Sequence, residues 1–166
     1  DNLKNYMSWD QIRELQEDGV FIGSQTKTHP HMHLLTPIKV EQEIALSNER
    51  FLEEIGQYPR LFAYPYGEYS LNVIKAVRDS GFIAAFGQNS GVLFAGDNMF
   101  ELPRFAFNEN YGSLERLKLA LDGKPLRVSD VTPRNMVLSE NPPSYGFTVD
   151  ESLNPISQLR CFSGEY

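Results

Sequence analysis

The sequence predicts an α/β fold of repeated strand–helix units, followed by a short β-rich appendage at the C-terminal end. Over roughly the first 122 residues, short apolar runs alternate with amphipathic helical patterns, which is typical of such units. Beyond them, prolines and short strand-like runs replace the helical period. We therefore predict two parts: residues 1–123 as the α/β domain, and residues 124–166 as a Pro-punctuated, β-rich tail or the start of an accessory domain.

The first helix is predicted after Ser8, which can form a capping box with Gln11, and Gly19 supplies its stop signal. Residues 20–22 (Val-Phe-Ile) then predict a buried strand. A loop that contains all three histidines of the chain follows this strand, and we term residues 23–33 the histidine loop.

A second helix is predicted from Thr36 and Pro37 to Gly56, because Pro is favoured in the first helical turn and Gly just after the last. Its apolar face consists of Val40, Ile44, Phe51 and Ile55. Residues 61–64 (Leu-Phe-Ala-Tyr) form the next apolar run, which predicts a strand that leads into a Pro-Tyr-Gly turn at residues 65–67.

Further strands and helices complete the pattern. Ser70 and Gly81 bound a third helix, residues 82–86 and 102–107 predict strands, and Ser113 begins a fourth helix. The apolar positions of these helices are Val73, Ile74 and Val77 in the third and Leu114, Leu117 and Leu121 in the fourth. The pattern gives three or four parallel strands, with the histidine loop and the Pro-Tyr-Gly turn at C-terminal strand ends, where α/β sheets place their sites.

The tail contains two more strand-like runs, at residues 145–149 and 159–162. The run at 159–162 has the pattern of a strand for which the sequence shows no pairing partner. One hypothesis therefore treats the tail as an interaction module carried on an α/β scaffold.

Composition and charge argue against several classes of protein. A net charge of −7 and the lack of a basic run disfavour a nucleic-acid partner, since phosphate backbones require a basic surface. No apolar stretch approaches the ~20 residues of a membrane span. The single cysteine, Cys161, excludes an internal disulfide and a cysteine-based zinc cluster, and we expect a buried, inert thiol there. Asp1 in place of Met fits a processed protein or an excised fragment.

The histidine loop contains His29, His31 and His33, which would share one face of an extended chain. Pro30 favours extended geometry at His29. Histidine is the commonest side chain to bind transition metals, so this spacing is compatible with a metal site. Surface or core-edge histidines with ordinary hydrogen bonds are the alternative.

Two segments resemble the motifs of a known family. Residues 23–30 read Gly-Ser-Gln-Thr-Lys-Thr-His-Pro, and residues 62–67 read Phe-Ala-Tyr-Pro-Tyr-Gly. They resemble the second and third motifs of the polysaccharide deacetylase family (carbohydrate esterase family 4, NodB-homology domain). Together with Leu-Pro-Arg at residues 102–104, they are similar to the branch of poly-N-acetylglucosamine deacetylases. The resemblance runs from about Met7 to about Gly123, roughly the C-terminal half of that domain, and implies part of a distorted (β/α) barrel of the NodB type.

The resemblance implies a divalent metal cofactor, most simply zinc, with His29 at the place of the family's second metal-binding histidine. Gln25 occupies the place of the first. This substitution weakens a zinc site, because imidazole suits zinc whereas an amide oxygen suits hard cations. Three interpretations stay open: Gln25 is a tolerated ligand, it marks lost catalysis, or the site is displaced to His31 or His33.

For the third motif, the resemblance implies that the backbone N–H of Tyr66 stabilises the oxyanion of a tetrahedral intermediate. Arg104 would orient an active-site carboxylate, with an ordinary structural ion pair as the alternative. Tyr64, Pro65 and Trp9 are the predicted substrate-binding residues.

The family's opening Thr-Phe-Asp-Asp motif supplies the catalytic base and a metal-binding aspartate, and residues 1–6 do not match it. The resemblance therefore implies metal-dependent hydrolysis of N-acetyl groups on an N-acetylglucosamine-containing polysaccharide, with this chain carrying only part of the active site. The missing N-terminal half of the domain, or a second chain, would complete it. An extracytoplasmic location, periplasmic or secreted, is also implied. The alternative function is a catalytically impaired, deacetylase-like protein that binds carbohydrate.

Overall fold

Two short parallel strands with helices packed on one face form the centre of the molecule. The structure, a computed structural model, describes residues 6–150, 152, 157 and 160. Strand β1 (Leu61–Ala63) pairs in parallel with β2 (Ala84–Phe86). A single parallel bridge flanks each of them, from Ser24 to β1 and from Leu102 to β2. Four parallel segments therefore lie side by side, as the sequence predicts, although only the inner two reach strand length.

The predictions of the two outer strands, at residues 20–22 and 102–107, are wrong. In the segment 20–22, expected to be buried, the side chain of Phe21 is 85% exposed, and pairing begins only at Ser24. In the segment 102–107, Leu102 exchanges backbone hydrogen bonds with its neighbours, but Pro103 follows directly and has no N–H to donate. An outer segment pairs on one side only, and in the segment 20–22 Val20 is exposed as well, whereas Ile22 is half-buried.

The predicted helices all form. They are α1 (Trp9–Glu17), α2 (Pro37–Ile55), α3 (Leu71–Asp79) and α4 (Leu114–Asp122), with short 3-10 turns η2 (Met32–Leu34) and η3 (Pro65–Gly67). Ser8 makes the predicted capping box with Gln11, and the Ser70 and Ser113 hydroxyls accept hydrogen bonds from backbone N–H groups in the first turn of their helices. Gly56 ends α2 in the left-handed conformation that glycine adopts without strain.

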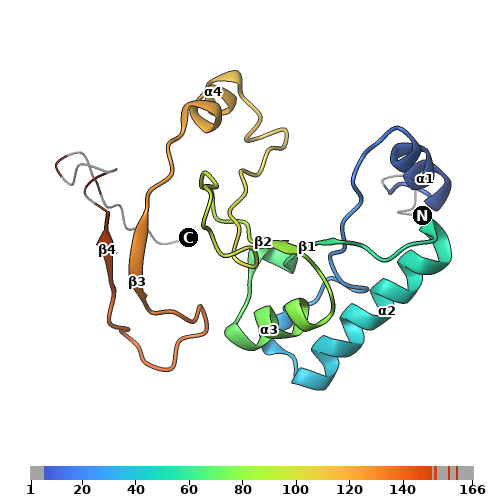
Figure 1. Ribbon diagram of the computed structural model, residues 1–166, viewed down its shortest axis with the longest axis horizontal. Helices are drawn as coiled ribbons and strands as arrows, with labels where there is room; N and C mark the ends of the chain where they lie inside the picture. Colours follow the sequence, from blue (N-terminus) through green and yellow to red (C-terminus); the bar gives the residue numbers. More distant parts are fainter. Residues whose placement is uncertain (1–5, 151, 153–156, 158–159, 161–166) are drawn as a thin grey trace.

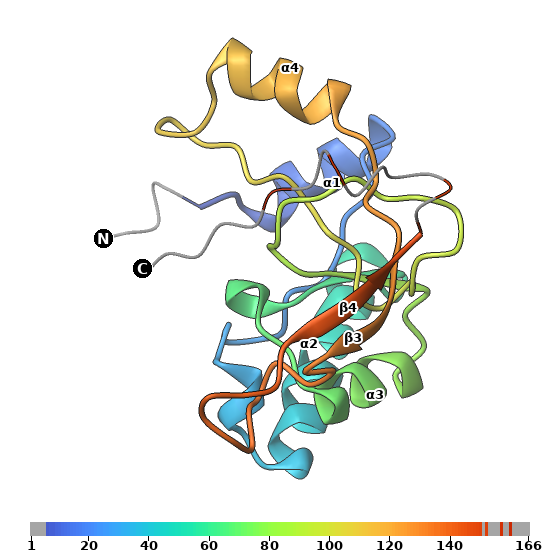
Figure 2. The ribbon, with the colours of Figure 1, turned by 90° about the vertical axis from the view of Figure 1, so that its left-hand side faces the viewer.

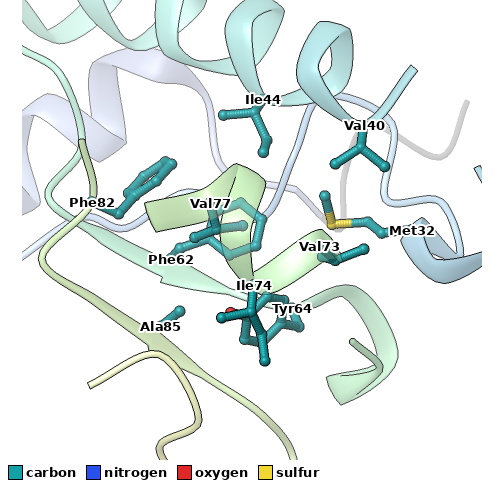
Figure 3. Close-up of a cluster of buried hydrophobic side chains, with 10 residues drawn as sticks. All are labelled: Met32, Val40, Ile44, Phe62, Tyr64, Val73, Ile74, Val77, Phe82 and Ala85. Carbon is teal, nitrogen blue, oxygen red and sulfur yellow. The ribbon is translucent and has the colours of Figure 1, made fainter. Parts of the chain in front are cut away.

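The core lies between α2, α3 and one face of the sheet. Figure 3 shows Val40 and Ile44 reaching from α2 toward the strands, with Met32 at one end of the cluster and Phe82 at the other. The buried cluster consists of Met32, Val40, Ile44, Phe62, Tyr64, Val73, Ile74, Val77, Phe82 and Ala85. This core anchors the end of β1, from which the Pro-Tyr-Gly turn leaves.

The C-terminal part contains an antiparallel hairpin of β3 (Val128–Thr132) and β4 (Gly146–Val149). In Figure 1 the hairpin and α2 lie on opposite sides of β1 and β2. Figure 2 views the molecule from the side of the hairpin. The strand predicted at 145–149 is confirmed as β4, whereas β3 was not predicted. The strand expected at 159–162 and the buried thiol expected at Cys161 fall outside the described residues, Arg160 excepted.

The fold class predicted from the sequence is confirmed as mixed α/β with small sheets, and the described residues do not close a barrel. The domain boundary at residue 123 stays a prediction; α4 ends at Asp122 and β3 begins at Val128. The tail is attached to the α/β part by polar contacts. Arg134 pairs with Glu101 at 3.1 Å, and Asn135 accepts a hydrogen bond from the first N–H of α3 at 3.4 Å.

Candidate functional site

The Pro-Tyr-Gly turn presents a backbone amide at the C-terminal end of β1. The Tyr64 N–H donates to the carbonyl of Phe86 at 2.9 Å, so pairing with β2 continues up to the turn. Tyr66 then adopts a left-handed conformation (φ 57°, ψ 6°) that non-glycine residues rarely take. Within the described part of the chain, its N–H donates no hydrogen bond. The turn therefore holds a free amide donor on a rigid support.

Gly67 makes this turn possible. Its φ is +73°, and a Cβ added there would lie 2.3 Å from Cβ of Gln88 and 2.6 Å from the backbone nitrogen of the same residue. Any side chain at this position would therefore displace either the turn or the loop that follows β2.

The ring of Tyr66 lies against two rings of the histidine loop. The imidazole of His31 stacks on it with a centroid distance of 4.0 Å and an interplanar angle of 11°. The imidazole of His29 meets it edge-on, with centroids 4.6 Å apart and an angle of 72°. The sequence motifs at residues 23–30 and 62–67 thus meet in space, and we term His29, Tyr66 and His31 the aromatic clamp.

The histidine loop is held by short-range and longer hydrogen bonds. Thr26 and His29 both have positive φ, 69° and 57°, and the His29 N–H donates to the Thr26 hydroxyl at 3.0 Å. Thr28 donates its N–H and its hydroxyl to the two carboxylate oxygens of Glu43 on α2, both at 2.9 Å. The extended geometry that Pro30 predicts at His29 is therefore wrong, because this local network overrides the weak bias of the following proline.

Glu68 is a site residue that the sequence did not reveal. Its Oε2 lies 2.6 Å from Nδ1 of His31 and 3.2 Å from Nδ1 of His33. A single glutamate outside any motif of spaced functional residues does not indicate a site. Its position directly after the Pro-Tyr-Gly turn is the one feature of the sequence that could have suggested it.

The structure places two predicted substrate-binding residues in the core. The side chain of Tyr64 is 0% exposed, and its hydroxyl donates to the carbonyl of Phe100 at 2.9 Å. Burial raises the pKa of this hydroxyl well above its usual range. Pro65 is also buried. Their burial favours packing that anchors the turn over direct contact with a substrate.

Trp9 and Arg104 do not join the clamp. Trp9 packs on α2, with its ring edge-on to Phe51 at 6.0 Å and the guanidinium of Arg50 5.6 Å from its centroid. Arg104 donates its backbone N–H to the carbonyl of Asn89 at 3.1 Å. Its buried Nε has no hydrogen-bond partner within the described residues. The role predicted for Arg104 beside an active-site carboxylate stays a prediction.

The described residues do not fit a complete metal centre. Gln25, half-buried, and His29 offer one amide and one imidazole, whereas zinc sites in proteins use at least three side-chain ligands. In the part of the chain that the structure describes, no three His, Cys, Asp or Glu side chains are grouped in a way that could hold a metal ion.

A pocket of about 200 Å³ opens beside Glu68. It lies between the histidine loop and the tail, and its lining residues are His33, Glu68, Tyr69, Met136 and Val137. Burial, and secondarily the negative charge of Glu101, raises the pKa of the Tyr69 hydroxyl above its usual range.

Comparison with known proteins shows which family the chain resembles. A family model described as polysaccharide deacetylase matches residues 1–85. YxkH of Bacillus subtilis (strain 168), whose name assigns it to the polysaccharide deacetylases, is 27% identical over 101 residues, which cover 61% of this chain and 36% of YxkH.

Solved structures give the same fold. The deacetylase PplD of Streptococcus pyogenes, in complex with acetate, superposes with a TM-score of 0.64 at 21% identity, over 70% of this chain and 51% of that one. IcaB of Ammonifex degensii gives a TM-score of 0.58 at 24% identity, over 69% and 52%. The chain thus spans about a third of the length of YxkH and about half of each of these two solved chains.

Proposed function

This chain belongs to the polysaccharide deacetylase family, and we propose that the intact protein hydrolyses N-acetyl groups on an N-acetylglucosamine-containing polysaccharide. The observation that supports the proposal most directly is the free Tyr66 N–H, fixed at the end of β1 beside His29. This chain would carry only part of the active site. The rest comes from the N-terminal half of the domain or from a second chain.

The reaction adds water to the acetamide carbonyl and then breaks the C–N bond, releasing acetate and a sugar amine. Negative charge develops on the carbonyl oxygen in the tetrahedral intermediate. The Tyr66 N–H would donate to that oxygen at roughly 2.7–3.1 Å, the usual separation in an oxyanion hole. Since the left-handed turn is already formed, the donor needs no reorganisation during the reaction. We assign the base that deprotonates the water to an aspartate outside this chain.

A divalent metal, most simply zinc, stays part of the proposal for the intact protein. When bound, it would polarise the carbonyl and activate water. His29 would be one ligand, and Gln25 would stand where a second imidazole is expected. The remaining donors would lie outside this chain. An extracytoplasmic location is part of the same proposal; among the described helices, none combines the length and the apolarity needed to cross a bilayer.

The test is acetate release from N-acetylglucosamine oligomers by the full-length protein, with zinc, cobalt or nickel added and a chelator as control. We expect metal-dependent release that the chelator abolishes. Gln25→His should raise both zinc affinity and rate, whereas Gln57→His, at an exposed position after α2, should change neither. Absence of release from both the natural protein and Gln25→His would contradict the proposal.

The second candidate is a protein that binds the polysaccharide without deacetylating it. Gln25 and the lack of a three-ligand group among the described residues favour it. It predicts oligomer binding that a chelator does not change, with no acetate released. Metal-dependent acetate release would exclude this function.

A further inference from the structure

We propose that Glu68 is a positioning residue for the proposed deacetylation: it holds His31 against the ring of Tyr66 and thereby fixes the backbone amide of the Pro-Tyr-Gly turn. This inference rests on the proposed function. It adds a carboxylate that does not touch the substrate and acts through the aromatic clamp.

The contacts form a continuous chain from Glu68 to the turn. The carboxylate oxygen Oε2 lies 2.6 Å from Nδ1 of His31, a short distance for a hydrogen bond with a ring N–H. The imidazole plane of His31 is then nearly parallel to the Tyr66 ring, at 11° and 4.0 Å. His29 contacts the same ring edge-on at 4.6 Å. The Tyr66 ring is therefore held from two sides by one loop.

Tyr66 needs such support from its side chain. A non-glycine residue in the left-handed region is strained, and such residues persist only where their surroundings over-determine them. The core cannot supply all of that support, because the side chain of Tyr66 is 49% exposed. The preceding Pro65 is buried and the following Gly67 is sterically fixed, so the clamp restrains the one residue between them that projects into solvent.

A second imidazole of the histidine loop lies near Glu68. The same Oε2 is 3.2 Å from Nδ1 of His33, two residues beyond His31, but this contact lacks hydrogen-bond geometry, so the bond to His31 is the one that joins Glu68 to the loop. Glu43 anchors the middle of the loop through Thr28. Two carboxylates thus hold the histidine loop: Glu43 on α2 and Glu68 after the turn. Only Glu68 contacts a residue of the aromatic clamp.

The ring geometry can be measured independently of activity. In the full-length protein with isotope-labelled histidine, the ring protons of His31 should be shifted upfield by the ring current of Tyr66, with His31→Gln identifying the resonance. Glu68→Ala should remove most of this shift, and Glu68→Gln should retain part of it, because an amide oxygen can still accept the imidazole N–H. Glu49→Ala, at an exposed glutamate of α2, should leave it unchanged.

The kinetic consequence is a fall in kcat with little change in KM, since the amide acts on charge that exists only in the transition state. For Glu68→Ala we expect a loss of about 10- to 100-fold in kcat, as for an active-site group misplaced by about 1 Å. Glu68→Gln should recover part of that loss, and Glu49→Ala should behave as the natural protein.

An unchanged His31 shift in Glu68→Ala would overturn the proposal. So would a lost shift with unchanged kcat, because Glu68 would then hold the ring without serving the reaction. If the natural protein releases no acetate, the proposed function fails, and with it the positioning role; the ring shift then decides by itself whether Glu68 holds the clamp.

Discussion

Residues 24–102 and residues 105–150 differ in what surrounds their apolar side chains. In the first region, α2, α3 and the sheet enclose the whole hydrophobic core that the described residues contain. In the second, α4 has no buried residue, every residue of β3 is exposed, and Leu121 of α4 is 75% exposed. Both regions nevertheless form helices and paired strands, and α3 and α4 both begin with a serine cap.

This difference indicates that caps and strand pairing specify local structure, whereas the stability of an element comes from the packing of its apolar side chains against other elements. The proposed oxyanion donor lies in the first region, where buried Tyr64 and Pro65 anchor the turn. The second region is attached through polar contacts such as the Arg134–Glu101 pair. We therefore expect substitutions in the two regions to differ in their cost.

The largest expected difference is between two truncations to alanine. Phe62 is 1% exposed and packs against Tyr64 and Phe82, so Phe62→Ala should lower the free energy of unfolding by about 3–5 kcal/mol. Leu121→Ala removes a similarly apolar but exposed side chain and should change it by less than about 0.5 kcal/mol. Urea denaturation of the full-length protein measures both. Equal costs would mean that α4 is covered in the intact protein, and the contrast between the regions would not hold.

Within the first region, two glycines with similar backbone conformations differ in their surroundings. Gly67 (φ +73°) and Gly56 (φ +77°) would both be strained as alanine, roughly 1–2 kcal/mol each. Only at Gly67 would the new Cβ also clash, with Gln88, which adds roughly 1–3 kcal/mol. Gly67→Ala should therefore cost more stability than Gly56→Ala, and it alone should reduce acetate release. If Gly67→Ala loses no more activity than Gly56→Ala, the clash at Gly67 has no specific effect on the turn.

The sequence predicted what is local and missed what depends on distant partners. Helix ends such as Ser8 were predictable, because a cap and its helix lie within a few residues. The buried strand predicted at 20–22 does not form, since burial depends on neighbours that these residues do not specify. In the site, the motifs identified the two segments that meet at Tyr66. Glu68 was missed because its role depends on how the turn places it, and Tyr64 was assigned to substrate although it faces the core.

Raising the pH should weaken the first region. Burial raises the pKa of the Tyr64 hydroxyl above its unfolded value of about 10, so the folded state favours the neutral form. The stability contributed is complete below pH 10 and is lost as pH rises from there through the folded pKa. Tyr64→Phe should cost about 0.5–1.5 kcal/mol at pH 8, because the hydrogen bond to Phe100 is lost, and should reduce the further loss at pH 11. Tyr58→Phe, at an exposed tyrosine, is the control; an equal alkaline loss in Tyr64→Phe and the natural protein would contradict this assignment.

The smallest effect concerns the attachment between the regions. Arg134 and Glu101 form a partly exposed ion pair, so Arg134→Ala should change the global free energy of unfolding by only about 0.2–1 kcal/mol. Its local effect should be easier to detect, because the pair joins the tail to the α/β part. Amide hydrogen exchange should become faster in β3 and β4 and stay unchanged in α2. Lys75→Ala breaks an exposed pair with Asp79 inside α3 and should leave exchange in the hairpin as it was. If Arg134→Ala also leaves it unchanged, contacts other than this ion pair hold the hairpin.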